Sequence, residues 1–283
     1  MSNRSEIESL VYLLEDPDPY VREKVLERFQ TLGGNAVPVL DEVKQDIRSP
    51  LQLETVNSIL FDLVFPDIYA EFHDLILNGF ETYQELERAL ILLSQFGNPT
   101  LRPSVVTHQL DHMAHVVSDE ITYALDQIER MNILLSYIFS DCGFKGTKED
   151  YHNPDYSYLN KVLQTKTGIP ISLSIIVLLL GERLELPFYG INMPMHFLLM
   201  YQNGAEKVYV DAYQQGASVS MDHIGNFLKM NGVEPKSHYF TQASYKEIVI
   251  RWIRNMQFAY QKRDDVFRIN KLGDLLELFE AHG

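Results

Sequence analysis

The stretch GIPISLSIIVLLL, residues 168–180, is the most apolar in the chain, and it begins with a glycine, a proline and two serines. Its apolar run is about a dozen residues long, whereas a membrane-spanning helix needs roughly twenty, and the charged Glu182 and Arg183 follow. Because residues 175–180 are apolar on all sides, we predict a helix that is buried in the protein core. Pro170 suits the first position of this helix, where an N–H would have no helical partner.

The two serines of this stretch lie where the helix is predicted to begin. Ser172 and Ser174 would occupy or adjoin the first turn, where unpaired amides and the positive end of the helix dipole favour a developing anion. A nucleophile in that position would have an oxyanion-stabilising environment close by. The commoner role for a serine at a helix start is to cap the helix. The residues alone leave both roles open for Ser172.

Three segments after Pro187 are short and rich in β-branched and aromatic residues: PFYGINM, HFLLMYQ and KVYVDAY. Pro194 separates the first two, and Asn203-Gly204 separates the second from the third. This pattern predicts an antiparallel sheet. Since helical patterns precede and follow the sheet, the expected fold class is α+β.

A tight hairpin would bring a histidine next to an aspartate. If Asn203 and Gly204 form the centre of a type I′ turn, the register places His196 directly opposite Asp211. Opposed residues point to the same face of a sheet, with Cα atoms roughly 5.5 Å apart or less, so the carboxylate could accept a hydrogen bond from the imidazole. Such a pair has the arrangement of a base and its orienting group. The alternative is a histidine beside an aspartate on a solvated sheet face.

Residues 143–216 carry a dense set of motifs: GF in a loop, LN in a helix, GIPISLS, PMHF and VD. Together they resemble the SirB-type branch of the transglutaminase-like superfamily. The resemblance implies a papain-like α+β core, in which a central helix bears the nucleophile at its N-terminus and packs on an antiparallel sheet that presents His and then Asp. It implies catalytic roles for Ser172, His196 and Asp211, with Ser174 as the alternative nucleophile.

The sequence departs from active transglutaminase-like enzymes, which carry cysteine at the helix start. The equivalent position here is Ser172, by its spacing to Leu186-Pro187, and serine is far harder to deprotonate than cysteine, whose free pKa is about 8.5. The usual Asp-Pro-Phe is also changed, to Asp211-Ala212-Tyr213. The first hypothesis is therefore a binding or scaffold protein that recognises a protein or peptide. The second is a hydrolase or acyltransferase that acts on protein amide, ester or isopeptide bonds through Ser172, His196 and Asp211.

Helical patterns flank this core on both sides. An aspartate-proline turn at residues 16–19 joins two amphipathic stripes and resembles a HEAT repeat, which cannot bury its own apolar face, so residues 51–64 and 68–77 are expected to supply a second helix pair. Residues 251–278 resemble a tetratricopeptide helix pair. We predict three regions: a HEAT-like region at 1–80, a transglutaminase-like domain with a helical lead-in at 81–240, and a C-terminal helix pair at 241–283.

The charge of the chain bears on its partners. With 24 basic and 39 acidic residues, the formal net charge is −15, which repels nucleic acid phosphate and anionic lipid, so we expect neither as a partner. The single cysteine, Cys142, excludes an internal disulfide and a cysteine-based metal knuckle. The first residues lack the pattern of a secretory signal. We therefore expect a cytoplasmic protein that binds a protein or peptide.

Two other groups of residues are rival candidates for chemistry. Cys142 lies at the expected C-terminal end of a helix, where the dipole disfavours a thiolate, so we do not expect it to be a nucleophile. His108, His112 and His115 share one helix face, and histidines four residues apart can bind zinc or nickel. Because no glutamate base lies between the first two, we expect a solvated face there. No cofactor or metal is expected.

Overall fold

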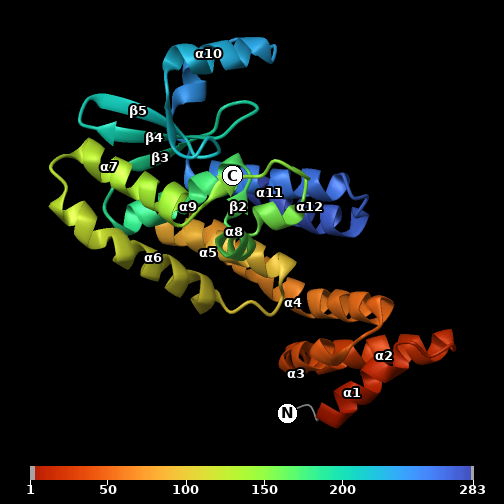
Figure 1. The fold of residues 1–283 in the computed structure, drawn as a ribbon. Coiled ribbons are helices and arrows are strands. Elements are labelled where there is room, and N and C mark those ends of the chain that lie inside the picture. Colours follow the sequence, from red (N-terminus) through yellow and green to blue (C-terminus); the bar gives the residue numbers. More distant parts are fainter. Residues whose placement is uncertain (1–3, 282–283) are drawn as a thin grey trace. The chain divides into compact units, whose positions relative to one another are not determined.

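The structure is a computed structural model that describes residues 4–281 and divides the chain into two compact units (Figure 1). The first unit contains the residues up to Asp74 together with Ser94–Leu101. The second contains Leu75–Leu93 and the chain from Arg102 onward. The sheet and the family motifs of residues 143–216 belong to the second unit.

The first unit is helical and has its own apolar core. Asp18 caps the second helix by accepting a hydrogen bond from the Tyr20 amide at 2.9 Å, and the helix ends at Gly33, which has a φ of 56°. Ile7, Phe29 and other buried side chains form the core. The helices of this part of the chain are α1 (Arg4–Leu13), α2 (Pro19–Leu32), α3 (Val37–Val43) and α4 (Pro50–Asn78).

The predicted second helix pair is wrong in one respect. Residues 51–64 and 68–77 belong to one continuous helix, α4, with Pro66 inside it. A proline removes one N–H donor from a helix, but Phe65 just before it and Ile68 just after it are both buried. Packing on both sides of Pro66 therefore stabilises a helix that the sequence pattern divides. The HEAT-like character of this region stays a prediction.

After α4, the described chain carries eight further helices and two small sheets. The helices are α5 (Tyr83–Gly97), α6 (Pro103–Tyr123), α7 (Gln127–Ser136), α8 (Leu159–Thr165), α9 (Pro170–Arg183), α10 (Met221–Met230), α11 (Tyr245–Gln261) and α12 (Val266–Ala281). The strands are β1 (Lys145–Gly146), β2 (Thr167–Gly168), β3 (Phe188–Ile191), β4 (Leu198–Asn203), β5 (Glu206–Asp211) and β6 (Ala217–Val219). A π-helical turn at Tyr137–Asp141 extends α7.

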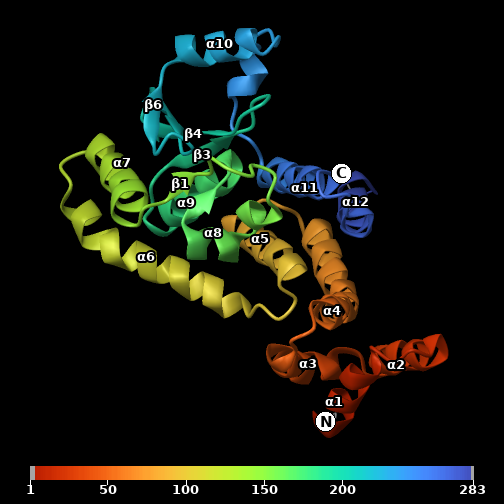
Figure 2. The ribbon, with the colours of Figure 1, turned by 45° about the vertical axis from the view of Figure 1, so that its right-hand side comes forward.

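Helix α9 is the central element of the second unit, as its sequence predicts. It begins at Pro170, and every residue from there to Gly181 is buried. Helices α6, α7 and α8 and strands β3 and β4 pack around it (Figure 2). Among residues 4–281, no helix combines the length and the apolarity that crossing a membrane would require.

The larger sheet is antiparallel with strand order β3-β4-β5-β6, which confirms the predicted sheet but not its register. Asn203 pairs with Glu206, so the central residues of the turn are Gly204 and Ala205, one position later than predicted. Gly204 has a φ of 60°, and a glycine at the first central position is what a type II′ turn requires. His196 is consequently not opposite Asp211 in the ladder, and it lies in the loop before β4.

The two faces of this sheet pack against different helices. On one face, Met200 and Tyr209 of the sheet contact Ile224 and Leu228 of α10 in one apolar cluster. Figures 1 and 2 both show α9 on the other side of the sheet. The C-terminal helices α11 and α12 pack against each other in the same unit, and the Trp252 indole donates a hydrogen bond to the Ser157 carbonyl at 2.7 Å. Their tetratricopeptide-like character stays a prediction.

Candidate functional site

His196 and Asp211 form a hydrogen-bonded pair beside the end of β5 and the start of β4, the two inner strands of the sheet. The distance between His196 Nε2 and Asp211 Oδ2 is 3.0 Å. Asp211 is the last residue of β5, whereas His196 follows Met195, whose φ of 67° places it in a backbone region that non-glycine residues rarely adopt. The pair predicted from the hairpin therefore exists, but the loop before β4, and not strand opposition, brings the two side chains together.

The chain after β5 fixes the Asp211 carboxylate. Its Oδ1 atom accepts hydrogen bonds from the backbone amides of Tyr213, at 2.9 Å, and Gln214, at 3.3 Å. These two bonds hold Oδ1 in place and leave Oδ2 for His196. None of the described residues bonds the other ring nitrogen of His196. The pair thus has an oriented imidazole with one nitrogen available to a ligand.

A cavity of about 940 Å³ adjoins this pair. Tyr213 closes one side, and its phenol donates to the Thr147 carbonyl. Burial together with the Asp211 charge raises the pKa of this phenol. Apolar and aromatic side chains dominate the rest of the lining, which no lysine or arginine of the described chain joins. The further lining residues are Tyr151, Pro170, Met193, Met195, Leu198, Gln214, Ala217, Ser218, Val219, Ser220, His223, Ile224 and Phe227.

Ser172 does not reach this cavity. Its side chain is fully buried, and its hydroxyl oxygen accepts a hydrogen bond from the Ile169 amide at 2.9 Å and donates to the Ile169 carbonyl at 3.1 Å. Gly168 leaves the space for this arrangement, because a Cβ atom there would lie 2.5 Å from the Ser172 hydroxyl. Pro170, two residues earlier, is the α9 residue that lines the cavity. The structure therefore brings His196 and Asp211 next to Pro170, and Ser172 caps the helix.

Ser174, the alternative nucleophile, is also placed in the core. It is fully buried on α9, and its hydroxyl has no hydrogen-bond partner among the described residues. It is absent from the described lining of the cavity. Neither serine is thus positioned to attack a ligand that contacts His196.

The rival candidates lie away from the cavity. Cys142 is half-buried at the end of the π-helical turn after α7. His108, His112 and His115 are all exposed, as a solvated helix face requires. Within residues 4–281, no group of three or more histidine, cysteine, aspartate or glutamate side chains is arranged to hold a metal ion.

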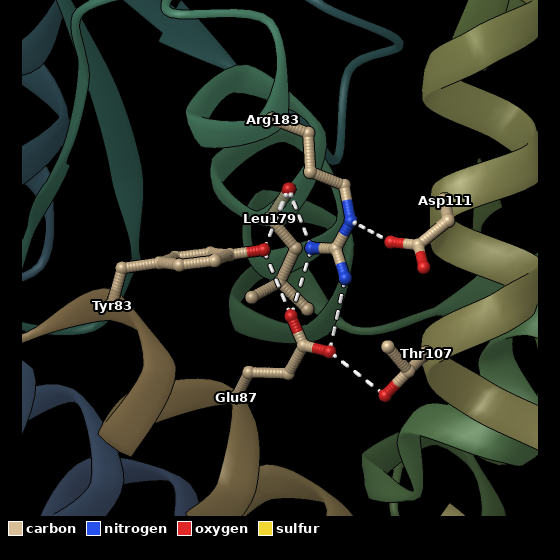
Figure 3. Close-up of polar contacts among 6 residues, drawn as sticks. All are labelled: Tyr83, Glu87, Thr107, Asp111, Leu179 and Arg183. Carbon is tan, nitrogen blue, oxygen red and sulfur yellow. Dashed lines mark hydrogen bonds and ion pairs between the residues drawn. The ribbon is translucent and has the colours of Figure 1, made fainter. Parts of the chain in front are cut away.

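A second polar cluster lies at the other end of α9 (Figure 3). The Arg183 guanidinium donates two hydrogen bonds to the Glu87 carboxylate, at 2.8 and 3.0 Å, and a third to Asp111 at 2.8 Å. Glu87 also accepts hydrogen bonds from the Tyr83 and Thr107 hydroxyls. Burial raises the pKa of Glu87 and lowers that of Arg183. The cluster joins α5, α6 and α9 and has its main donors and acceptors paired, so its role is structural.

Several residues of the site were missed from the sequence. Pro170 is read from the sequence only as a helix start, although it lines the cavity. Tyr213 occupies the position where the family pattern has phenylalanine. This departure from the pattern could have indicated that Tyr213 belongs to the site. Glu87 had no usable signal, because its partner Arg183 is 96 residues away in the chain.

Comparison with known proteins identifies the family. A family model described as the transglutaminase-like superfamily matches residues 104–254, more than half of the chain. F-box only protein 21 from Mus musculus is 23% identical over 250 residues, which cover 85% of this chain and 36% of that protein. A UPF0162 protein from Xylella fastidiosa (strain Temecula1 / ATCC 700964) is 24% identical over 172 residues, covering 56% of this chain and 61% of that protein.

Protein SirB1 from Salmonella typhimurium is 24% identical over 153 residues, which cover 54% of this chain and 56% of that protein. This chain therefore spans between 36% and 61% of the length of these three relatives. No solved structure matches. The matched region contains α9, the sheet and the His196–Asp211 pair. The chain belongs to the transglutaminase-like superfamily, in the SirB-type branch that its motifs resemble.

Proposed function

We propose that this protein binds a peptide or a protein segment in the His196–Asp211 cavity and does not cleave it. The observation that carries the proposal is the position of Ser172, whose hydroxyl is bonded to Ile169 while Pro170 lines the cavity. A general base acts on a nucleophile within hydrogen-bond reach. Because Pro170 has no nucleophilic group, the His196–Asp211 pair has none beside it on α9.

The lining of the cavity supports a ligand that is mainly apolar and has a polar group. Binding cavities are usually concave and apolar, with a few polar groups that fix the orientation of the ligand. Here Leu198, Ile224 and Phe227 provide apolar surface, and His196 offers one ring nitrogen to a hydrogen-bonding group. An apolar side chain of a peptide, with its adjacent backbone amide or carbonyl, fits this combination.

A peptide-binding measurement tests the proposal. Heptapeptides selected from a random display library on the purified full chain would be labelled with fluorescein, and their dissociation constants measured by fluorescence anisotropy. We expect His196→Gln to weaken binding at least tenfold, and the matched variant His115→Gln, at an exposed histidine of α6, to leave it unchanged. Ser172→Ala should also bind normally. Equal binding by His196→Gln and the wild type would contradict the proposal.

The second candidate function is the serine-dependent hydrolase or acyltransferase that the family resemblance implies. The 3.0 Å contact between His196 and Asp211 favours it, because this pair is a base with an orienting carboxylate. It requires the Ser172 hydroxyl to leave Ile169 and enter the cavity. Labelling of Ser172 by a fluorophosphonate probe, lost in His196→Gln but not in His115→Gln, would establish this function and overturn the first proposal.

A further inference from the structure

A second cavity lies on the other side of Tyr213. Its volume is about 740 Å³, and Tyr213 and Gln214 line both cavities. Strands β1 and β2, the loop after β1 and the loop between β5 and β6 form its walls. In contrast to the first cavity, its lining is mostly polar and includes two lysines. The lining residues are Lys145, Gly146, Thr147, Lys148, Glu149, Tyr156, Thr167, Tyr213, Gln214 and Gln215.

The two lysines have no ionic partner within the part of the chain that the structure describes. Neither Lys145 nor Lys148 forms an ion pair, although the chain has 39 acidic residues for 24 basic ones. Both ammonium groups line the same cavity, so their charge there is available to an anion.

Neutral donors stand beside the lysines. No described residue bonds the Tyr156 hydroxyl or the side-chain amides of Gln214 and Gln215. The hydroxyls of Thr147 and Thr167 donate to backbone carbonyls of their own loops and are therefore occupied. Lysine ammonium groups, a phenol and amide N–H groups are all hydrogen-bond donors, and an oxyanion accepts from each of them.

Glu149 is the one acidic residue among the described residues that line this cavity. Its carboxylate opposes an anion, but two lysines leave a local excess of one positive charge. The charge of the first cavity has the opposite sign, because its lining includes Asp211 and no lysine or arginine of the described residues. The two cavities therefore select different chemical groups on either side of Tyr213.

We propose that the cavity at Lys145 and Lys148 binds an oxyanion, either the carboxylate of an acidic group or a phosphate. The ammonium groups supply the charge, and the Tyr156 hydroxyl and the amides of Gln214 and Gln215 supply additional hydrogen bonds. This site does not depend on the peptide-binding function proposed for the first cavity. If both sites are occupied by one ligand, its anionic group lies next to its apolar group, with Tyr213 between them.

Nuclear magnetic resonance titration of the isotope-labelled full chain tests the proposal. Sodium phosphate and sodium acetate are titrated separately, with sodium chloride at matched ionic strength as the reference. We expect saturable shifts in the backbone amides of residues 145–149 and 214–215 with at least one of the two oxyanions. The comparison of phosphate with acetate identifies which source of the oxyanion binds more tightly.

The double variant Lys145→Gln, Lys148→Gln should bind the oxyanion at least tenfold more weakly. The control, Lys207→Gln with Lys229→Gln, removes the same charge outside this cavity and should bind as the wild type does. His196→Gln should also leave oxyanion binding unchanged, which separates this site from the first cavity. The proposal would be overturned if the oxyanions shift these amides no more than sodium chloride does. It would also be overturned if the Lys145→Gln, Lys148→Gln protein binds the oxyanion as tightly as the wild type. The same spectra report whether each variant is folded.

Discussion

The two ends of helix α9 carry polar clusters that are buried to nearly the same extent but differ in what they leave unpaired. The side chains of His196 and Asp211 are 16% and 12% exposed, and those of Arg183 and Glu87 are 14% and 10% exposed. At the C-terminal end, Arg183 bonds Glu87, Asp111 and the Leu179 carbonyl. At the N-terminal end, one imidazole nitrogen and a cavity remain open to a ligand.

This difference shows that burial of a charged pair does not by itself mark a functional site. A closed network of hydrogen bonds stabilises the packing of the helices that contribute to it. A pair with unused hydrogen-bonding capacity beside a cavity can bind a ligand. We therefore expect changes at the Arg183–Glu87 pair to alter stability, and changes at the His196–Asp211 pair to alter binding.

The largest expected effect on stability is at Arg183. Arg183→Ala leaves the buried Glu87 carboxylate without its main partner, which should lower the free energy of unfolding by about 3–5 kcal/mol. Urea denaturation followed by circular dichroism measures this change. Arg263→Ala, which removes the exposed ion pair with Asp150, is the control and should cost no more than about 1 kcal/mol.

A double variant sharpens the interpretation of that result. Replacing both partners, with Arg183→Met and Glu87→Leu, should recover much of the lost stability, because apolar residues of similar size often replace a buried ion pair at little cost. Failure of the double variant to recover would mean that the remaining contacts of the cluster, with Tyr83, Thr107 and Asp111, matter more than the unpaired charge.

The next largest effect is expected at Gly168. Gly168→Ala would place a Cβ atom 2.5 Å from the Ser172 hydroxyl, and overpacking of this kind typically costs about 1–3 kcal/mol. Thermal and urea denaturation measure the loss. Adding Ser172→Ala removes the clashing oxygen and should restore part of the stability. No recovery in the double variant would show that Leu173, whose side chain is 3.2 Å from the same position, causes the strain.

Ser172→Ala alone should have a smaller effect. It removes the hydroxyl that accepts from the Ile169 amide, and loss of one intramolecular hydrogen bond costs about 1 kcal/mol. Urea denaturation measures the change in stability, and fluorescence anisotropy measures peptide binding, which should not change. A loss of binding with unchanged stability would mean that the Ser172 hydroxyl takes part in ligand binding and does not only hold the start of the helix.

The smallest effect on stability is expected at His196. His196→Gln keeps a hydrogen-bonding side chain beside Asp211 and should change the free energy of unfolding by less than about 1 kcal/mol, although it weakens peptide binding at least tenfold. Denaturation and anisotropy on the same preparation separate the two quantities. A large loss of stability would indicate that the pair is structural, like Arg183 and Glu87.

Much of the fold could be predicted from local patterns. The apolar run at residues 168–180 predicted the buried helix, and the short aromatic segments after Pro187 predicted the antiparallel sheet. Two elements could not be predicted correctly in this way. The hairpin turn is centred on Gly204 and Ala205 because strand pairing, and not the Asn-Gly dipeptide, sets the register. Helix α4 continues through Pro66 because packing outweighs one lost hydrogen bond.

In the candidate site, too, some features could be predicted from local sequence and others could not. The sequence by itself determined the family motifs and the burial of α9, because each depends on residues close together in the chain. It predicted the His196–Asp211 pair from a hairpin register that the structure does not have, and the loop before β4 decides this contact. Only the tertiary structure decided that the Ser172 hydroxyl bonds Ile169 and that Pro170 lines the cavity. The direction in which a side chain points at a helix start depends on the atoms packed around it, here the space beside Gly168, and no local pattern encodes that space.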